Sequence, residues 1–157
     1  VMQRPIREIE SLWQDTLEWW ETVIQEETAF PGVEGRNLDL TVTLRPLSVL
    51  CHFTLALAKE GEHAFFVEWD AARKELILDR SREGSLQDIV HLRRLHAERR
   101  DESMTLRILI DKESVELFVN GGEKSLSAVL FSPPSAKGIT FASDVPVCLS
   151  LEAHHLG

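Results

Sequence analysis

The chain has 157 residues, of which 43% are hydrophobic and 27% are charged, a composition typical of a soluble globular protein. Its length suits one domain that buries roughly 70% of its unfolded surface. The net charge of −9 disfavours nucleic acid, because the phosphates would repel the protein. No apolar run approaches the roughly 20 residues of a membrane helix, and no signal peptide is visible at Val1. We therefore expect neither nucleic acid nor membrane as a partner.

The first two dozen residues differ in pattern from the rest. Apolar side chains recur every three or four positions from Ile6 to Ile24, which is the spacing of one helix face. Pro5 suits a first helical turn, because its missing N–H costs nothing there. Taken alone, this pattern predicts a helix from Pro5 to about Gln25.

From Asn37 onward, apolar and polar side chains mostly alternate, which is the period of a strand with unequal faces. Turn-forming residues such as Glu60-Gly61-Glu62 separate the segments. The expected strands cover 38–46, 53–57, 65–69, 76–78, 89–95, 106–110, 115–119, 127–131, 138–141 and 147–151. Ten or so short strands predict an all-β fold, a sandwich or barrel of antiparallel sheets.

The segment from Glu113 to Glu123 carries the clearest strand signal. Its alternation ends at Asn120-Gly121, a pair that supplies the positive φ of a tight hairpin, and Gly122 leaves room for a bulge. Together with 127–131 and 138–141, this segment predicts a meander of three strands.

Cysteine and histidine usage indicates neither a disulfide framework nor a metal site. Cys51 and Cys148 are expected to be free thiols, and a bridge between them is the less favoured alternative. His154 and His155 are expected in the C-terminal tail, where two adjacent histidines make a poor metal site. We expect no cofactor.

Three motifs resemble the C-terminal β-sandwich of glycoside hydrolase family 32, which contains invertases, sucrose-6-phosphate hydrolases, levanases and inulinases. Gln3–Leu12 is similar to the family's linker, Q-x-P-x-x-E-L-x-x-L. Leu78-Asp-Arg-Ser81 with Gly84 is similar to L-D-R-S-x-S-G, although Glu83 replaces the second serine. The strand trio between Glu113 and Asp144 follows in the same order as in the family.

The resemblance implies a sandwich of two antiparallel sheets, with about six strands each and a short N-terminal linker helix. It favours a helix over Pro5–Trp13 and a first strand near Thr22–Glu27 in place of one long helix. Residues 1–13 would form an inter-domain linker, and residues 14–157 the C-terminal β-sandwich domain.

In that family a separate β-propeller carries the catalytic N-D-P-N, R-D-P and E-C motifs, none of which occurs in this sequence. The resemblance therefore implies no catalytic residue here. It implies a non-catalytic module of a β-fructofuranosidase, which stabilises the propeller of the same polypeptide and could form a homodimer. The enzyme would be a sucrose-6-phosphate or sucrose hydrolase. The bacterial cytoplasm is favoured as its location, and secretion remains open.

Candidate site residues have competing interpretations. Asp79 and Arg80 are expected to be structural or inter-domain residues at a strand end, with substrate contact as the alternative. Trp13 and Trp20 are expected to pack on the core or on another domain, because interfaces favour tryptophan. Trp69 is the candidate for sugar contact, which would make the chain a carbohydrate-binding module instead.

The stretch from His91 to Arg100 is the one basic run of an acidic chain. It could bind phosphate, because arginine forks match phosphate oxygens. The favoured interpretation is that its side chains balance nearby acids such as Glu98 and Asp101.

A third hypothesis for the whole chain, beside the fructosidase module and the carbohydrate-binding module, is an independent jelly-roll protein unrelated to fructosidases.

Overall fold

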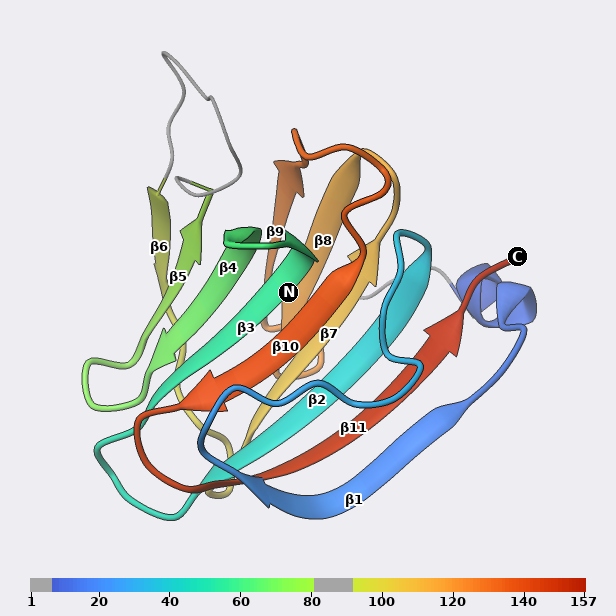
Figure 1. Ribbon diagram of the computed structural model, residues 1–157. Helices are drawn as coiled ribbons and strands as arrows, with labels where there is room; N and C mark the ends of the chain where they lie inside the picture. Colours follow the sequence, from blue (N-terminus) through green and yellow to red (C-terminus); the bar gives the residue numbers. More distant parts are fainter. Residues whose placement is uncertain (1–6, 81–91) are drawn as a thin grey trace.

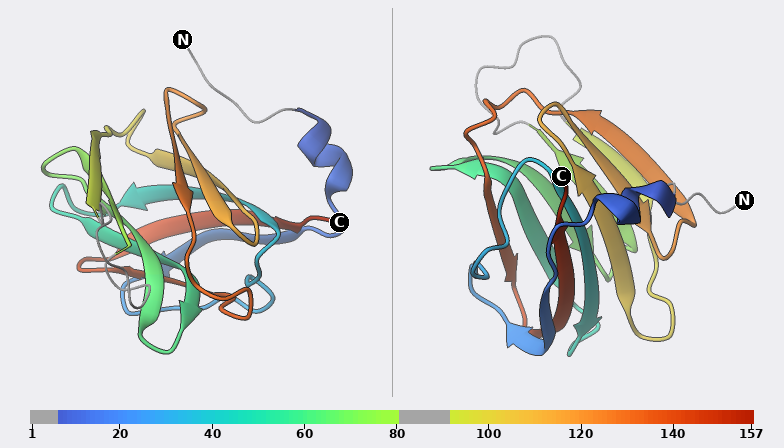
Figure 2. Two further views of the ribbon diagram at one scale, coloured as in Figure 1. Left: turned by 90° about the horizontal axis from the view of Figure 1, so that it is seen from above. Right: turned by 90° about the vertical axis from the view of Figure 1, so that its right-hand side faces the viewer.

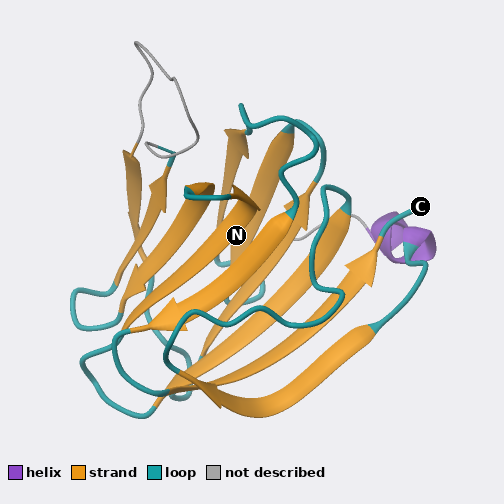
Figure 3. Ribbon diagram, viewed as in Figure 1, coloured by secondary structure: helices purple, strands orange, loops and turns teal. Residues whose placement is uncertain are grey.

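Two antiparallel β-sheets face one another in the computed structural model, which describes residues 7–80 and 92–157 (Figures 1 and 3). A short 3-10 helix, η1 (Arg7–Leu12), precedes them. The all-β class that the alternation predicted and the two-sheet sandwich that the resemblance implied are therefore confirmed, with six strands in one sheet and five in the other. In the described part of the chain, no helix is long and apolar enough to cross a membrane.

The six-stranded sheet has the order β1-β11-β2-β7-β8-β9. Its strands are β1 (Leu17–Ile24), β11 (Val147–His155), β2 (Leu38–Pro46), β7 (Met104–Ile110), β8 (Ser114–Val119) and β9 (Lys124–Val129).

The five-stranded sheet has the order β10-β3-β4-β5-β6. Its strands are β10 (Gly138–Ser143), β3 (His52–Glu60), β4 (His63–Asp70), β5 (Glu75–Asp79) and β6 (Leu92–His96). The expected residues 89–91 of β6 lie outside the described residues.

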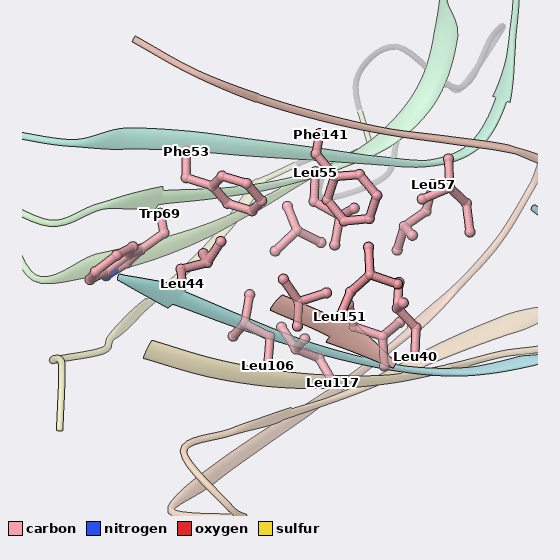
Figure 4. Close-up of a cluster of buried hydrophobic side chains, with 14 of the residues drawn as sticks. Leu40, Leu44, Phe53, Leu55, Leu57, Trp69, Leu106, Leu117, Phe141 and Leu151 are labelled. Atoms are coloured by element: carbon pink, nitrogen blue, oxygen red, sulfur yellow. The ribbon is translucent and has the colours of Figure 1, made fainter. Parts of the chain in front are cut away.

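The core lies between the sheets and follows from the strand alternation. In β2, Leu38, Leu40, Val42 and Leu44 are completely buried, whereas Thr41 and Thr43 are partly exposed on the opposite face. Figure 4 shows leucines of one sheet meeting Phe53, Leu55, Leu57, Trp69 and Phe141 of the other. Burial of these apolar faces is the main favourable term in the stability of such a sandwich.

The N-terminal segment is a short helix followed by a strand, and not one long helix. η1 ends at Leu12, as the linker motif implied, and β1 starts at Leu17, five residues before the expected Thr22. β1 pairs with β11, and its ladder is broken by a bulge between Trp19 and Thr22. Helical spacing is overridden here because the open ladder of β11 satisfies the backbone groups of β1.

The predicted three-stranded meander is wrong at its third strand. β8 and β9 form a hairpin, but β10 pairs with β3 in the opposite sheet. Residues 130–137, which include Pro133-Pro134, make this crossing. The hairpin loop covers residues 120–123, since Val119 pairs with Lys124, and is longer than a two-residue turn. Asn120, Gly121 and Gly122 all have positive φ, as the turn prediction requires.

The placement of the two terminal histidines was also predicted wrongly. His154 and His155 belong to β11 and not to a tail, and His154 is only 3% exposed. Both cysteines are buried free thiols, as expected.

The two ends of the six-stranded sheet differ. At the first, which we call the linker end, Leu38 pairs with Ile110 and with His155, and η1 lies beside the C-terminus (Figure 2). At the second, the far end, Pro46 pairs with Val147. Two buried polar residues that pair with each other, Asp39 and His154, lie at the linker end.

Candidate functional site on the six-stranded sheet

Trp13 attaches the linker to the outer face of the six-stranded sheet. Its indole stacks on the His154 ring with a centroid separation of 3.5 Å and an interplanar angle of 1°. The indole Nε1–H donates a hydrogen bond of 3.0 Å to Oδ2 of Asp39. The backbone of Trp13 also forms a β-bridge with Leu156. Trp13, the residue directly after η1, thus contacts both β2 and β11.

Asp39 is the buried acceptor beneath Trp13. It occupies an outward position of β2, yet it is only 1% exposed because the linker covers it. Arg107 of β7 donates two hydrogen bonds to it, from Nε to Oδ1 (3.0 Å) and from Nη2 to Oδ2 (2.7 Å). The side-chain hydrogen bond to Asp39 raises the pKa of Arg107. A buried carboxylate is tolerable here because a bidentate cation and an N–H satisfy it.

His154 joins the linker to β11 beneath the same indole. Its Nδ1 lies 3.0 Å from the carbonyl oxygen of Asp15 and 3.2 Å from Oγ1 of Thr16. Its Nε2 lies 2.9 Å from Oε1 of Glu152. Both ring nitrogens therefore have partners, so this buried side chain is a structural group.

His155 and Asp15 form the outer part of the network. The His155 backbone N–H donates to Oδ1 of Asp15 (2.9 Å), and its Nδ1 lies 2.9 Å from Oδ2. The backbone N–H and the ring of His155 together lower the pKa of Asp15. Burial acts to lower the pKa of His155, but the hydrogen bonds to Asp15 and to the Glu34 carbonyl outweigh it and raise the pKa. Hence each partner favours the charged form of the other.

We call this network the linker clamp; it consists of Trp13, Asp15, Asp39, Arg107, His154 and His155. It contains no nucleophile activated by a base. Its contacts hold the linker against β2 and β11, and so fix the position and direction in which the chain enters the sandwich.

Arg80 connects the two sheets at the linker end. It is 8% exposed, and its Nη1 donates a 3.2 Å hydrogen bond to the carbonyl of Val129, at the end of β9. Its guanidinium lies 5.4 Å from the ring centroid of Phe131. Asp79 is the last residue of β5 and pairs with Phe66 and Leu92. Ser81 and Gly84 of the same motif lie outside the described residues.

The structure does not bring the predicted tryptophans together. Trp20 is 73% exposed on β1, away from the core. Trp69 is 1% exposed, and its Nε1–H donates to the Ala97 carbonyl at 3.3 Å. A sugar ring could not stack on Trp69 here, because both faces of the indole lie in the core.

The basic stretch is occupied by internal contacts. Arg94 bonds to Glu75 at 3.0 Å, and Arg100 lies 2.6 Å from Glu123. Arg93 of β6 donates to the Ser127 carbonyl of β9 at 2.8 Å, which joins the edge strands of the two sheets. These contacts agree with the favoured interpretation of balanced charges. His91 lies outside the described residues.

A hollow of about 470 Å³ beside this stretch contains two carboxylates, Glu98 and Glu123. A hydrogen bond from His96 lowers the pKa of Glu98, and one from Arg100 lowers the pKa of Glu123. A glycosidase general acid needs a raised pKa, so this pair is unsuited to that role. Within residues 7–80 and 92–157, no group of three or more His, Cys, Asp or Glu side chains could hold a metal ion.

Sequence reasoning missed the buried polar residues. Asp39 and Arg107 occupy solvent-facing positions of their strands, and only the covering linker buries Asp39, whereas Arg107 stays partly exposed. Arg36, 5% exposed, donates to the carbonyls of Asp111 (3.2 Å) and Pro133 (2.8 Å), and so ties two loops together. No local sequence pattern marks Asp39, Arg107 or Arg36 as site residues. Trp13 was recognisable, because a tryptophan in a mostly polar linker segment is expected to pack on another surface.

Almost the whole chain matches one family model. Residues 8–155 match the family described as glycosyl hydrolases family 32 C terminal. The chain belongs to this family. The match begins within η1 and ends at His155, so the linker clamp lies inside the family domain.

Curated relatives carry this family 32 domain as a small part of their length. The chain is 30% identical to a levanase of Bacillus sp. (strain L7) over 98% of the chain and 18% of that protein. It is 32% identical to a probable sucrose-6-phosphate hydrolase of Vibrio cholerae over 89% of the chain and 23% of that protein. The chain thus spans about a fifth of these relatives.

Solved structures show the same fold. The sucrose-6-phosphate hydrolase of Lactobacillus gasseri matches 99% of this chain with a TM-score of 0.82 and 19% identity, over 31% of its own length. The exo-inulinase of Aspergillus awamori matches 99% with a TM-score of 0.81, also at 19% identity, over 32% of that chain.

Proposed function

We propose that this chain is the non-catalytic β-sandwich module of a β-fructofuranosidase, and that it stabilises a catalytic β-propeller in the same polypeptide. The observation that carries the proposal is the family match over residues 8–155, combined with relatives described as levanase and sucrose-6-phosphate hydrolase. The absence of N-D-P-N, R-D-P and E-C from the 157-residue sequence supports it. So do the lowered pKa values of Glu98 and Glu123.

The linker clamp supplies the physical means for this role. A propeller that precedes Arg7 would be joined to the sandwich through η1, and Trp13 holds the end of η1 to β2 and β11. A rigid attachment lowers the entropy of inter-domain motion, which favours docking. Asp79 and Arg80 lie at the same end of the sandwich, which suits the inter-domain role proposed for them.

The enzyme would cleave terminal β-fructofuranosyl bonds, with sucrose 6-phosphate or sucrose as favoured substrates. Its favoured location is a bacterial cytoplasm, which two free thiols would suit.

The test compares the purified chain with the enzyme that contains the propeller. We expect the chain alone to release no fructose from sucrose, sucrose 6-phosphate, levan or inulin above the buffer rate. In the enzyme, Trp13→Ala should lower the thermal midpoint of the propeller, whereas Trp20→Ala, outside the clamp, should not. Hydrolysis by the isolated chain would refute the non-catalytic role. A propeller with unchanged stability when the whole module is deleted would refute the stabilising role.

A further inference from the structure

The turn between β8 and β9 contains the pair Asn120-Gly121, whose covalent chemistry the proposed function does not use. Asparagine is a heat-labile residue, because the backbone nitrogen of the following residue can attack its side-chain amide. Glycine in the following position leaves this nitrogen unobstructed, since glycine has no Cβ. The sequence contains two asparagines, and the other, Asn37, is followed by Leu38. Asn120 is therefore the asparagine of this chain that most readily loses its amide.

The reaction is deamidation, and it consumes water. The backbone nitrogen of Gly121 attacks Cγ of Asn120, and a bond forms between these two atoms. The Cγ–Nδ2 bond breaks, and Nδ2 leaves as ammonia with the proton of the Gly121 nitrogen. Water then opens the resulting cyclic imide at either of its carbonyl carbons. The product is aspartate, or isoaspartate, in which the backbone runs through the side-chain carbonyl. No atom is oxidised or reduced.

The fold restrains the side-chain amide of Asn120 from three sides. Its Oδ1 accepts a hydrogen bond of 3.1 Å from the Thr105 N–H, and its Nδ2 donates to the Glu98 carbonyl at 2.6 Å. Arg100 lowers the pKa of Glu123 most, and a hydrogen bond from the Asn120 side chain also lowers it. The amide can turn toward the following backbone nitrogen only when these hydrogen bonds break.

The backbone of the turn is restrained as well. The Asn120 N–H donates to the Thr105 carbonyl at 2.7 Å, which joins the turn to β7. The N–H groups of Gly122 and Glu123 both donate to the Val119 carbonyl, at 3.0 and 2.9 Å. Opening of the turn therefore breaks several hydrogen bonds together. Such local opening populates a minor state, and a reaction that needs the open state proceeds in proportion to that population.

The product of deamidation cannot restore these contacts. Aspartate carries an oxygen in place of Nδ2, so two acceptors would face each other at the Glu98 carbonyl. The added negative charge would also lie beside the Glu123 carboxylate, and like charges repel. Isoaspartate would lengthen the backbone of the loop that the Val119–Lys124 pair closes. Both products therefore disfavour the closed turn.

We propose that Asn120 is a modification site protected by the closed β8–β9 turn. Deamidation follows local opening of the turn, and the loss of ammonia makes it a one-way step after which the turn and residues 97–103 do not regain their native contacts. Asn120 also lines the hollow of about 470 Å³, so the reaction adds a carboxylate to a wall that already holds Glu98 and Glu123. This inference goes beyond the proposed function and does not depend on it.

Peptide mapping by mass spectrometry tests the proposal on the 157-residue chain, kept at mildly alkaline pH either folded or in urea that unfolds it. We expect conversion of Asn120 to be at least about tenfold slower in the folded chain, because closing the turn makes at least two hydrogen bonds to its amide. Asn37, whose Nδ2 donates to the Leu156 carbonyl at 2.9 Å, is the internal control. It should react more slowly than Asn120 in urea, since leucine follows it.

Two alanine variants separate opening of the turn from loosening elsewhere. Glu123→Ala removes one partner of the Asn120 amide, and should speed conversion in the folded chain at least about threefold. Glu75→Ala breaks an ion pair with Arg94 on the other sheet, and should change the rate less than about twofold. Circular dichroism would confirm that both variants are folded.

Asn120→Asp reproduces one product of the reaction directly. We expect a lower urea midpoint than in the parent chain, and faster hydrogen exchange in residues 97–103 and 120–123, since the hydrogen bond to the Glu98 carbonyl is lost.

Several results would overturn the proposal. Equal rates at Asn120 in the folded and the unfolded chain would mean that the turn gives no protection. Equal acceleration by Glu123→Ala and Glu75→Ala would mean that the reaction follows unfolding of the whole domain. An Asn120→Asp variant with the urea midpoint and exchange rates of the parent would mean that the product closes the turn normally. The assay involves no sugar, so hydrolysis by the chain would refute the proposed function and leave this result unaffected.

Discussion

Asp39 illustrates how a residue's neighbours, and not its position in a strand, decide its environment. Strand alternation places it on the outer face of β2, where a carboxylate would normally be hydrated. The linker instead buries it to 1% exposure, and Arg107 and Trp13 replace the lost water with three hydrogen bonds. Removal of one partner would leave buried polar groups unsatisfied, which costs more than the bonds themselves contribute.

Asp39→Ala should therefore destabilise the domain by about 2–3 kcal/mol, somewhat below the usual cost of breaking a buried ion pair because Arg107 is partly exposed. Urea denaturation would measure the free energy of unfolding. Glu75→Ala is the control: it breaks the more exposed pair with Arg94, and should cost less than about 1 kcal/mol. Equal losses in the two variants would contradict the burial argument.

The His155–Asp15 contact predicts a pH dependence. Because the native pKa of His155 is raised, its contribution to stability is complete below about pH 6.5 and is lost as pH rises through the native pKa. Because the pKa of Asp15 is lowered, its contribution is present above about pH 3.9 and is lost as pH falls through the native value. The contact is thus strongest in mildly acidic solution.

An NMR titration would check this linkage. The pKa of His155 should fall in Asp15→Asn, because that variant loses both the charge and the hydrogen bond to the ring. Asp70→Asn, on the other sheet, should leave the titration of His155 unchanged. An unaltered His155 pKa in Asp15→Asn would show that the clamp geometry is wrong.

At the scale of single elements, the β8–β9 turn shows how one side chain can hold three segments. Asn120 has a φ of 49°, a conformation that asparagine tolerates better than most residues. Its Oδ1 accepts a bond from the Thr105 N–H (3.1 Å), and its Nδ2 donates to the Glu98 carbonyl (2.6 Å). The turn therefore also fixes the loop that precedes β7.

Two replacements of Asn120 separate the loss of its side-chain hydrogen bonds from the strain of its positive φ. Asn120→Ala loses both bonds and strains the backbone, and should cost about 2–3 kcal/mol. Asn120→Gly loses the same bonds without the strain, and should be more stable than the alanine variant by about 1 kcal/mol. Thermal or urea unfolding would measure both. A glycine variant less stable than the alanine variant would contradict the assigned φ.

At the scale of the whole molecule, the two sheets share one core and depend on each other. Phe141 of β10 is completely buried and contacts Phe30, which precedes β2, and Phe53 of β3, with ring centroids 5.4 and 6.4 Å away. Arg80 and Arg93 join the sheets at the β6–β9 side. Neither sheet could bury its inner face alone, so we expect one cooperative unfolding transition.

Phe141→Ala should destabilise the whole domain by about 3–5 kcal/mol, as large-to-small changes in cores do. Circular dichroism and tryptophan fluorescence should give one shared midpoint, because Trp69 lies in the same core. Phe131→Ala, at a side chain that is 47% exposed, should cost less than about 1 kcal/mol. Two separated transitions would mean that the sheets unfold independently.

The all-β class and most strand positions could be predicted from the sequence, because alternation and turn residues are local properties, and three motifs resembled those of the family. Leu38 to Leu44 and Val115 to Val119 show this, since their inward side chains were evident from spacing. Long-range contacts in the folded chain place β10 in the opposite sheet, bury Asp39 and His154, and leave Trp20 exposed while Trp69 is buried. These outcomes depend on contacts such as that between Thr16 and His154, which are 138 residues apart. No window of neighbouring residues contains both partners, so only the folded chain brings them together.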